Sequence, residues 1–414
     1  VENWYEMRIA YLLFDPGIPV GGTKGASIHV SEFCRAASAL GHEIHLIATR
    51  VVGDGVPSVI LHHIELPYIK ASDGSKFQAA NEFSERAFDV LREIKPDLIY
   101  ERLSLFFGEG RQLAIRLGIQ RLLEVNAPIV DERIEHFNLD LIDEARAKEA
   151  AAIYGADVIA VSESLCAYIR TNEAKTISVF PNGVDTERFG SVIKYRYDTQ
   201  SMSLKVTSDP KGPSDPTTIG FVGSLKTWHG VNNLILASNL LFDRGIFHRL
   251  LIVGDGPEMT SLKQLSERSK ARARIHFVGA LEMSEIPSYL SSMDIGVAPY
   301  LLRGDFYFSP LKILEYMASS IAVIATRTPS IEAIVGGDAF LLSDPSPEAI
   351  ANAIATLIDD PTRRMELGKK ARDRVETSFT WNQTVSSILE VAASQKDGPD
   401  DVQFDSVDTI GQVQ

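Results

Sequence analysis

The sequence is poor in the residues and patterns that mark specialised classes of protein. It has two cysteines, Cys34 and Cys166, among 414 residues, too few for a disulfide framework, and neither has a Cys or His at metal-ligand spacing. Its longest apolar runs have the length of strands and fall short of the ~20 residues that a membrane-spanning helix needs. Residues 1–7 lack the basic-then-apolar pattern of a signal peptide. We therefore expect a cytoplasmic protein with buried free thiols and no transmembrane segment.

Basic residues are also in deficit. The chain carries 41 Lys and Arg against 55 Asp and Glu, a formal net charge of −14. Nucleic-acid binding rewards clustered Lys and Arg, because these side chains contact the phosphate backbone, so the balance predicts no nucleic-acid partner. Part of the charge lies in residues 396–414, which hold five aspartates and which we expect to form an acidic disordered tail.

The sequence does contain a repeated alternation of strand and helix patterns. Apolar runs typical of buried parallel strands alternate with segments of helical spacing, at 7–14, 43–49, 97–100, 120–125 and 157–161. The alternation resumes at 218–222 and continues to about residue 325. The prediction is an α/β protein with two Rossmann-like doubly wound domains that face each other across a cleft.

The predicted domain boundaries follow from where the alternation breaks. Residues 1–190 form the first domain. Residues 191–216 are rich in Ser, Asp, Pro, Gly and Lys, so we expect a flexible linker or insertion. Residues 217–395 form the second domain, together with helices at its end.

The segment 308–317 is the most informative local feature. Ser309 is a preferred N-cap and Pro310 a preferred first residue, so a helix is predicted to start here. The unpaired amides of Leu311 and Lys312, with the helix dipole, form a site for an anion such as a diphosphate. Glu315 lies on the same face, where it can accept bonds from ribose hydroxyls. Taken alone, the segment is equally an ordinary capped helix with a surface Lys–Glu pair.

Three further loops follow predicted strands and strengthen the interpretation of this segment as an anion site. Each is weak alone, and a lone His229 is more often a cap or a surface residue. Together they predict a phosphate-bearing ligand in the cleft, through Gly21, Gly22 and Lys24; Gly223, Ser224, Lys226 and His229; and Gly254, Asp255 and Gly256. No Walker A, GxSxG, HExxH, CxxC or Asp-x-Asp pattern occurs, so no metal site is predicted.

In order along the chain, these motifs resemble a known family. The set is Gly21-Gly22, residues 181–189 (PNGVDTERF), 221–225 (FVGSL), 253–257 (VGDGP), 277–279 (FVG) and 309–318. It is similar to the retaining glycosyltransferases of the GT-B fold in the "glycosyl transferases group 1" family (family four). The resemblance covers residues 7 to about 393.

The resemblance implies roles for individual residues. Asn126, Lys226, Lys312 and Glu315 are implied to be catalytic, with Glu315 on the ribose and Asn126 where many relatives place a cleft histidine. The implied donor-binding residues are Gly21, Gly22, Gly223, Ser224, His229, Gly254, Asp255, Gly256, Val278, Tyr307, Phe308, Ser309, Pro310 and Leu311. Lys24, Glu101 and Arg102 are implied to contact the acceptor. The sequence departs from the family at Ser224 and His229, where Arg and Lys are usual, and at Tyr307, where a first glutamate is expected; Lys226 can replace one of the missing cations.

The implied function is metal-independent transfer of a sugar, with retention, from a UDP-, GDP- or ADP-sugar to a hydroxyl of a soluble small-molecule or glycan acceptor. Residues 1–190 would form the acceptor side and 217–395 the donor domain. The nucleotide sugar is a co-substrate and no cofactor is required. The alternatives are a catalytically silent nucleotide-sugar-binding relative or partner subunit, and an epimerase or phosphorylase of the same fold. The segment 76–95 has nearly balanced charge, which argues against a basic membrane-binding helix without excluding peripheral contact. Donor sugar, acceptor and oligomeric state are not predicted.

Overall fold

Two parallel sheets organise the chain. The computed structural model describes residues 6–136, 138–190, 195–207, 215–301 and 307–394. The first sheet has the order β3-β2-β1-β4-β5-β6-β7 and the second the order β12-β11-β10-β13-β14-β15. The strands of the first are β1 (Arg8–Leu13), β2 (Glu43–Ala48), β3 (Ile60–His63), β4 (Leu98–Arg102), β5 (Gln120–Val125), β6 (Asp157–Ala160) and β7 (Thr176–Val179). Those of the second are β10 (Thr217–Val222), β11 (His248–Val253), β12 (Ile275–Gly279), β13 (Ile295–Ala298), β14 (Ala322–Thr326) and β15 (Phe340–Leu342).

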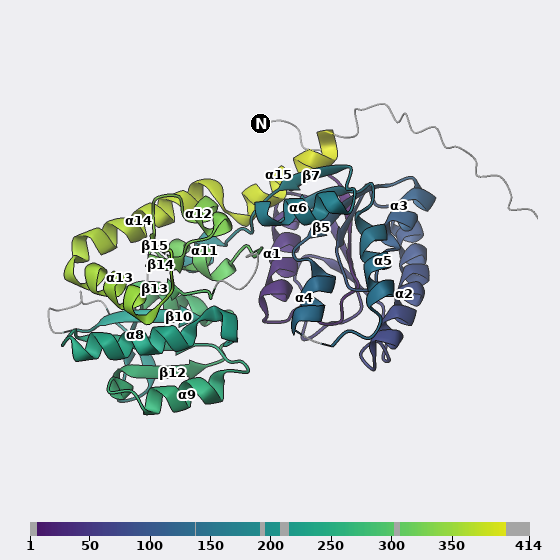
Figure 1. Ribbon diagram of the computed structural model, residues 1–414. Helices are drawn as coiled ribbons and strands as arrows, with labels where there is room; N and C mark the ends of the chain where they lie inside the picture. The colour runs from purple at the N-terminus through teal and green to yellow at the C-terminus, as the bar shows by residue number, and fades with distance from the viewer. Residues whose placement is uncertain (1–5, 137, 191–194, 208–214, 302–306, 395–414) are drawn as a thin grey trace, which may run out of the picture.

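Helices follow the strands in both halves, and the two lobes stand side by side (Figure 1). The helices of the first half are α1 (Gly25–Ala39), α2 (Asp73–Ile94), α3 (Gly110–Leu117), α4 (Ile129–His136), α5 (Ile142–Ile153) and α6 (Cys166–Thr171). Those of the second half are α8 (Val231–Asp243), α9 (Met259–Glu267), α10 (Ile286–Ser291), α11 (Leu311–Ala318), α12 (Pro329–Val335), α13 (Pro347–Asp359), α14 (Pro361–Ser378) and α15 (Trp381–Ser394). The short α7 (Thr186–Phe189) lies in the connection. The predicted α/β fold with two Rossmann-like halves is confirmed.

The core forms on both faces of each sheet, because successive strand residues point to opposite sides. In β1, Ile9, Tyr11 and Leu13 pack with α1, whereas Ala10 and Leu12 pack with α2 and α3. A strand covered on both sides buries consecutive residues, which is why β1 is apolar from Ile9 to Leu13. Both cysteines are buried and free, as predicted.

The last helix crosses back to the first domain. Its apolar residues Trp381, Val385, Ile388 and Leu389 belong to the same buried cluster as β1 and α1, and Figure 1 shows α15 lying over the first lobe. The prediction that residues 217–395 form one domain with its terminal helices is therefore wrong for α15. An amphipathic stripe specifies that a helix face is buried but not which core buries it.

Part of the predicted linker is an ordered hairpin. Strands β8 (Tyr195–Asp198) and β9 (Ser203–Val206) pair antiparallel, and the Tyr197 side chain is only 2% exposed. Its ring lies 5.5 Å from His276 and 6.5 Å from Tyr289, centroid to centroid. The expectation of a flexible linker is wrong for these residues, because one aromatic anchor docks the hairpin on the second domain. The expected acidic tail, 396–414, lies outside the described residues.

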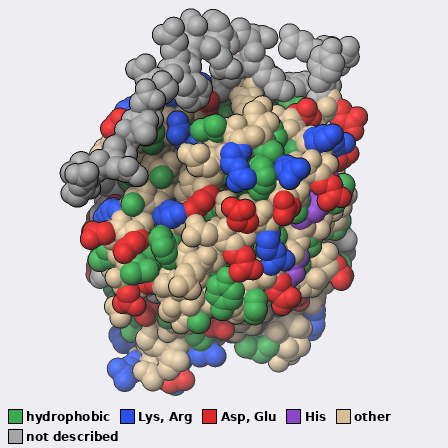
Figure 2. All heavy atoms as spheres, turned by 90° about the vertical axis from the view of Figure 1, so that its right-hand side faces the viewer, with side chains coloured by type: hydrophobic (Ala, Val, Ile, Leu, Met, Phe, Trp, Pro, Cys, Tyr) green, Lys and Arg blue, Asp and Glu red, His purple; other side chains and the backbone are tan. Residues whose placement is uncertain are grey.

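The outer face of the first domain has no field of a single sign. Seen from the side of α2 and α3, acidic and basic side chains are interspersed (Figure 2). Within the described ranges, no helix is both long and apolar enough to cross a membrane.

Candidate active site

The donor-side loops interlock where β10 and β11 end. Gly223 and Gly254 have φ of 138° and 132°, conformations that L side chains rarely adopt. A Cβ on Gly254 would lie 1.9 Å from the Gly223 carbonyl oxygen, and a Cβ on Gly256 would lie 2.6 Å from that of Leu225. The Leu225 amide donates to the Asp255 carbonyl over 2.9 Å. The glycines predicted from the sequence therefore allow two strand-end loops to approach each other directly.

Three nitrogen bases converge beside these loops. The Lys312 ammonium is buried, has no hydrogen-bond partner among the described residues, and lies 4.1 Å from the Phe221 ring centroid. Burial lowers its pKa to about 7. Burial also lowers the pKa of His229 to about 2, helped by Lys312, against the bond of its Nδ1 to the Ser224 carbonyl. Lys226 lies over the Trp228 ring, and burial lowers its pKa. The pocket thus lowers the pKa values of its own bases. A bound anion would stabilise their charged forms, so the pocket is suited to receive one.

Glu315 lies one turn beyond Lys312 on α11. Burial raises its pKa, while Lys312 and Arg188 oppose the rise. Lys312 and Glu315 therefore lie on one face of the helix and interact through their charges, without a direct ion pair. The Lys312 ammonium is buried, unlike that of the surface pair that was the alternative.

The start of α11 differs from the prediction. Pro310, not Ser309, occupies the N-cap position, and no side chain caps the helix. Instead, the Ser309 hydroxyl accepts a bond from the Asn182 amide over 2.9 Å. Ser309 is thus used to hold the connection between the domains, so the predicted cap is wrong. Leu311 opens the helix and packs against the first-domain core.

Tyr307 and Phe308 also face the first domain or each other. The Tyr307 ring packs against the first-domain cluster around β5 and β6 and lies 4.3 Å from that of Phe308. Burial and the Glu132 carboxylate raise its pKa. This placement differs from the expected contact with the donor. Val278 is half-buried and packs in the second-domain core.

On the first-domain side, the loop after β1 turns at Gly21, where φ is 79°. A Cβ on Gly22 would lie 2.8 Å from the Ser27 hydroxyl, so the loop closes tightly onto α1. Lys24 is exposed at the N-cap of α1. Its charge contributes to lowering the pKa of Lys226 across the cleft. The two glycine loops therefore face one another from opposite domains.

The ends of β4 and β5 hold a buried charge cluster. Oε1 of Glu124 accepts hydrogen bonds from the Arg102 guanidinium over 2.9 Å and from the Asn126 side-chain amide over 2.5 Å. Burial alone would raise the pKa of Glu124, but His29 and Arg102 bring it down to about 2. Arg102 is 7% exposed, so its guanidinium serves Glu124 and the expected acceptor contact is not supported. Asn126 is held at the cleft edge by Glu124.

Glu101 points the other way. It is 0% exposed and accepts a bond from Arg121 Nε over 2.6 Å. Neighbouring residues of a strand face opposite sides, so Glu101 and Arg102 could not both face the acceptor. The predicted acceptor contact of Glu101 is wrong.

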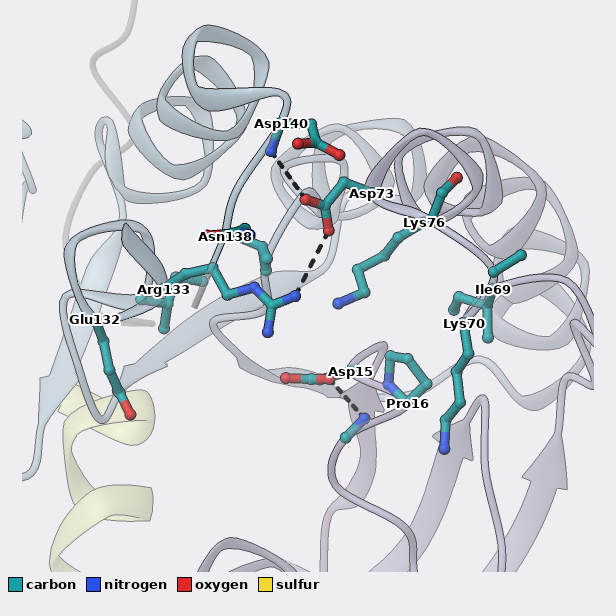
Figure 3. A pocket seen from close by; sticks show the side chains of 15 residues that line it. Asp15, Pro16, Ile69, Lys70, Asp73, Lys76, Glu132, Arg133, Asn138 and Asp140 are labelled. Carbon is teal, nitrogen blue, oxygen red and sulfur yellow. Dashed lines mark hydrogen bonds and ion pairs between the residues drawn. The ribbon is translucent and has the colours of Figure 1, made fainter. Parts of the chain in front are cut away.

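A cavity of about 650 Å³ lies in the first domain. The Lys76 ammonium points into it, and the Arg133 guanidinium is turned toward Asp73, 3.8 Å away (Figure 3). The Asp140 amide donates to the other oxygen of Asp73 over 3.1 Å. The wall combines charged side chains with apolar ones such as Ile69, Leu105 and Ile129; the charged residues are Asp15, Lys70, Asp73, Lys76, Glu132, Arg133 and Asp140. Much of this wall comes from the segments 69–76 and 129–133. Among the described residues, no group of three His, Cys, Asp or Glu side chains is arranged to hold a metal ion.

Two family models match the chain, and each covers one of the two domains. "Glycosyltransferase Family 4" matches residues 23–188, and "Glycosyl transferases group 1" matches residues 216–360. The chain is a family 4 glycosyltransferase. The resemblance read from the motifs is thereby confirmed, and the enzyme is a nucleotide-sugar-dependent glycosyltransferase of GT-B type.

Among the curated relatives, one covers nearly the whole glycosyltransferase and another covers more than half of it. One is the GDP-mannose-dependent alpha-(1-6)-phosphatidylinositol dimannoside mannosyltransferase of Mycobacterium tuberculosis, 27% identical over 403 residues, 92% of this chain and 95% of that protein. Another is the GDP-mannose-dependent alpha-mannosyltransferase of Corynebacterium glutamicum, 26% identical over 240 residues, 58% of this chain and 52% of that protein.

Solved structures share the fold of the glycosyltransferase. The sucrose-phosphate synthase of Thermosynechococcus elongatus superposes with a TM-score of 0.73 at 20% identity, over 94% of this chain and 99% of that chain. HepE of Anabaena, in complex with UDP and glucose, gives a TM-score of 0.69 at 18% identity, over 94% and 100%.

Proposed function

We propose that the enzyme transfers a sugar with retention of configuration at the anomeric carbon and without a metal ion. The observation that carries the proposal is the convergence of Lys226, His229 and Lys312 at the start of α11. Negative charge develops on the diphosphate as the glycosidic bond breaks, and preorganised cations and helix amides stabilise it. Lys312 supplies positive charge where the leaving group would lie, and Glu315 accepts bonds from the ribose.

We propose GDP-mannose as the donor, because the two relatives described above are named for it. The test is release of GDP, UDP or ADP from a panel of GDP-mannose, UDP-glucose and ADP-glucose, with and without EDTA. Turnover of GDP-mannose that survives EDTA, with an α-linked product by NMR, supports the proposal. A β-linked product refutes retention, loss of activity in EDTA refutes metal independence, and preference for another nucleotide refutes the donor.

A matched pair of lysine variants tests the site itself. Lys312→Met should lower kcat by about 10²-fold, the usual cost of one preorganised group that stabilises developing charge. Lys263→Met, on the exposed surface of α9, removes the same charge from the chain without touching the site. Equal effects of the two variants would refute the role of Lys312.

For the acceptor, we propose a polyhydroxylated molecule in the first-domain cavity. Carboxylates such as Asp15 and Asp140 accept bonds from hydroxyls and Lys76 donates to them, while the apolar part of the wall can pack against the C–H faces of a ring, so the cavity suits a sugar or a polyol. The mixed charges of the outer face favour an acceptor in solution. Lys76→Ala should raise the acceptor KM by at least about tenfold, since a lost hydrogen bond to a charged group costs roughly 1.5–3 kcal/mol, while the donor KM stays the same. Transfer only to acceptors presented on vesicles would refute the soluble acceptor.

A further inference from the structure

A chain of polar contacts connects the two domains through α1. His29 is 7% exposed, and its Nδ1 lies 2.7 Å from Asn182 Oδ1. Its Nε2 lies 2.7 Å from Glu124 Oε1. The ring therefore touches β5 of the first domain on one side and the turn that leads to the second domain on the other.

The orientation of Asn182 is fixed by its other partner. Its Nδ2 donates to the Ser309 carbonyl over 2.7 Å, and its main-chain amide donates to the Ser309 hydroxyl over 2.9 Å. A carbonyl oxygen only accepts, so the amide nitrogen must face Ser309 and Oδ1 must face His29.

The partner on one side fixes the position of a proton on the His29 ring. Asn182 Oδ1 only accepts, so Nδ1 carries a proton. On the other side, Nε2 lies 2.7 Å from Oε1 of Glu124. The ring is therefore held between the Asn182 turn and the carboxylate of β5.

Charged groups from several elements surround the ring. On β4 and β5, Arg102 shares Glu124 with it, and on β1 the Tyr11 hydroxyl lies 3.4 Å from Glu124 Oε2. From α15, Trp381 presents its ring at 5.2 Å between centroids. On α1 itself, Glu32 pairs with Arg35 and with Arg188 of α7, 3.0 Å away. His29, Glu124 and Arg102 thus form a buried cluster, and the ion pairs of Glu32 lead from α1 to the exposed Arg35 and the partly exposed Arg188.

We propose that His29 is a positioning residue whose ring couples Glu124 and Asn126 of the acceptor side through Asn182 to Ser309 at the start of the donor helix α11. The proposal rests on the proposed function of the cleft. The donor binds to the second domain, whereas Asn126 belongs to the first. The relay of contacts through His29 therefore sets the distance and orientation between the donor and Asn126. A misplacement of about 1 Å costs on the order of 10²-fold in rate.

The test separates turnover from nucleotide binding. His29→Gln keeps a hydrogen-bonding side chain but removes the ring that reaches both Asn182 and Glu124. We expect kcat to fall by about 10- to 100-fold, with the Kd for GDP measured by calorimetry changing by less than about threefold, because the donor loops lie in the other domain. Asn182→Ala should show the same split. The double variant should have a kcat little lower than that of the worse single variant, as expected for two residues in the same series of contacts.

A second interdomain contact supplies the matched control. The Ser162 hydroxyl donates to the Tyr307 carbonyl over 2.7 Å, so it also joins the domains close to α11. It does not belong to the chain of contacts through His29. Ser162→Ala should leave kcat within about threefold of the wild-type value, since a neutral hydrogen bond contributes roughly 0.5–1.5 kcal/mol. A fall in kcat equal to that of His29→Gln would show that any interdomain contact has this effect and would overturn the proposal.

A spectroscopic measurement tests the contact with Asn182 independently of turnover. With ¹⁵N-histidine labelling of the wild-type chain, His29 should give the signal of a protonated Nδ1, assigned by its loss in His29→Gln or, if that variant does not fold, by its change in Asn182→Ala. A ring without a proton on Nδ1 would overturn the proposal, as would parallel losses of kcat and GDP affinity. If no donor is turned over, the proposed function fails, while the NMR signals still test the relay.

Discussion

At the scale of single residues, Lys312 is the group whose environment is hardest to explain by stability alone. Its ammonium is buried without a hydrogen-bond partner among the described residues, and such a group costs stability in a native protein. The Phe221 and Tyr300 ring centroids lie 4.1 and 5.2 Å from its Nζ, and cation–π attraction offsets part of the lost stability. A buried ammonium without a hydrogen-bond partner, beside two glycine loops, is what the proposed diphosphate site requires.

The affinity for the nucleotide should therefore depend on pH through Lys312. Burial lowers the pKa of Lys312 to about 7 in the free enzyme, and a bound diphosphate, which favours the charged form, must raise it. By linkage, the affinity for GDP is full below about pH 7 and falls as the pH rises above it, by up to tenfold per unit, until the pKa of the complex is reached. Calorimetry between pH 6 and 9 measures the slope. Lys312→Arg, which stays charged, should flatten it; an unchanged slope in that variant contradicts the assignment.

The sequence showed which residues end the strands, but not which way each one faces. Gly223, Gly254 and Lys312 could be predicted, because glycine loops and helix starts are local patterns. Glu101 and Arg102 were expected to act together although adjacent strand residues diverge. His29 was missed altogether: its partners Asn182 and Glu124 lie 153 and 95 positions away, and only the folded chain brings them together.

At the scale of elements, the interlocking of the β10 and β11 loops makes a sharp prediction. Gly254→Ala would place a Cβ 1.9 Å from a backbone oxygen at a φ of 132°, so we expect a loss of about 3 kcal/mol in the free energy of unfolding and loss of GDP binding. Gly337→Ala is the control, because a Cβ there meets nothing within 4 Å. Denaturant unfolding measures both, and comparable losses would refute the interlock.

The hairpin β8–β9 gives a second prediction. Tyr197 is 2% exposed and is its main anchor, so Tyr197→Ala should lower the free energy of unfolding by about 3 kcal/mol, as for other buried aromatic residues. Val206 on the same hairpin is 70% exposed, and Val206→Ala should cost less than about 0.5 kcal/mol. A limited proteolysis experiment should then cut Tyr197→Ala at the hairpin before the wild-type chain. Equal protection would mean that the hairpin is held by other contacts.

Elements with strong patterns were predicted, and weakly patterned ones were missed. Strand β5 was predicted at its observed bounds from Leu122, Leu123 and Val125, and the strand is buried on both faces. The edge strand β3 was missed, since Ile60–His63 is half exposed and carries two histidines. The hairpin was read as linker because its composition is polar, although one buried tyrosine suffices to order it. Composition measures the average of a segment, whereas docking depends on single side chains.

At the scale of the whole molecule, the two domains are not consecutive pieces of chain. The connection near Val184 pairs with Thr380, and from there α15 enters the core of the first domain. The chain therefore passes between the domains twice, close to the His29 relay, since Trp381 touches both. A double crossing restricts how the domains can move, and it puts the last helix next to the groups that set their register.

The double crossing predicts that a change near residue 390 weakens the first domain rather than the second. Leu389 is 0% exposed in the cluster that contains β1 and α1, so Leu389→Ala should lower the free energy of unfolding by about 2–5 kcal/mol. Hydrogen exchange should accelerate in α1, β1 and β2 and stay unchanged in β10–β15, despite the position of Leu389 in the sequence. Glu390→Ala, exposed on the next position of the same helix, controls for helix propensity and should alter neither. Faster exchange confined to the second sheet would contradict the crossing, because α15 would then be stabilising the domain that precedes it in the sequence.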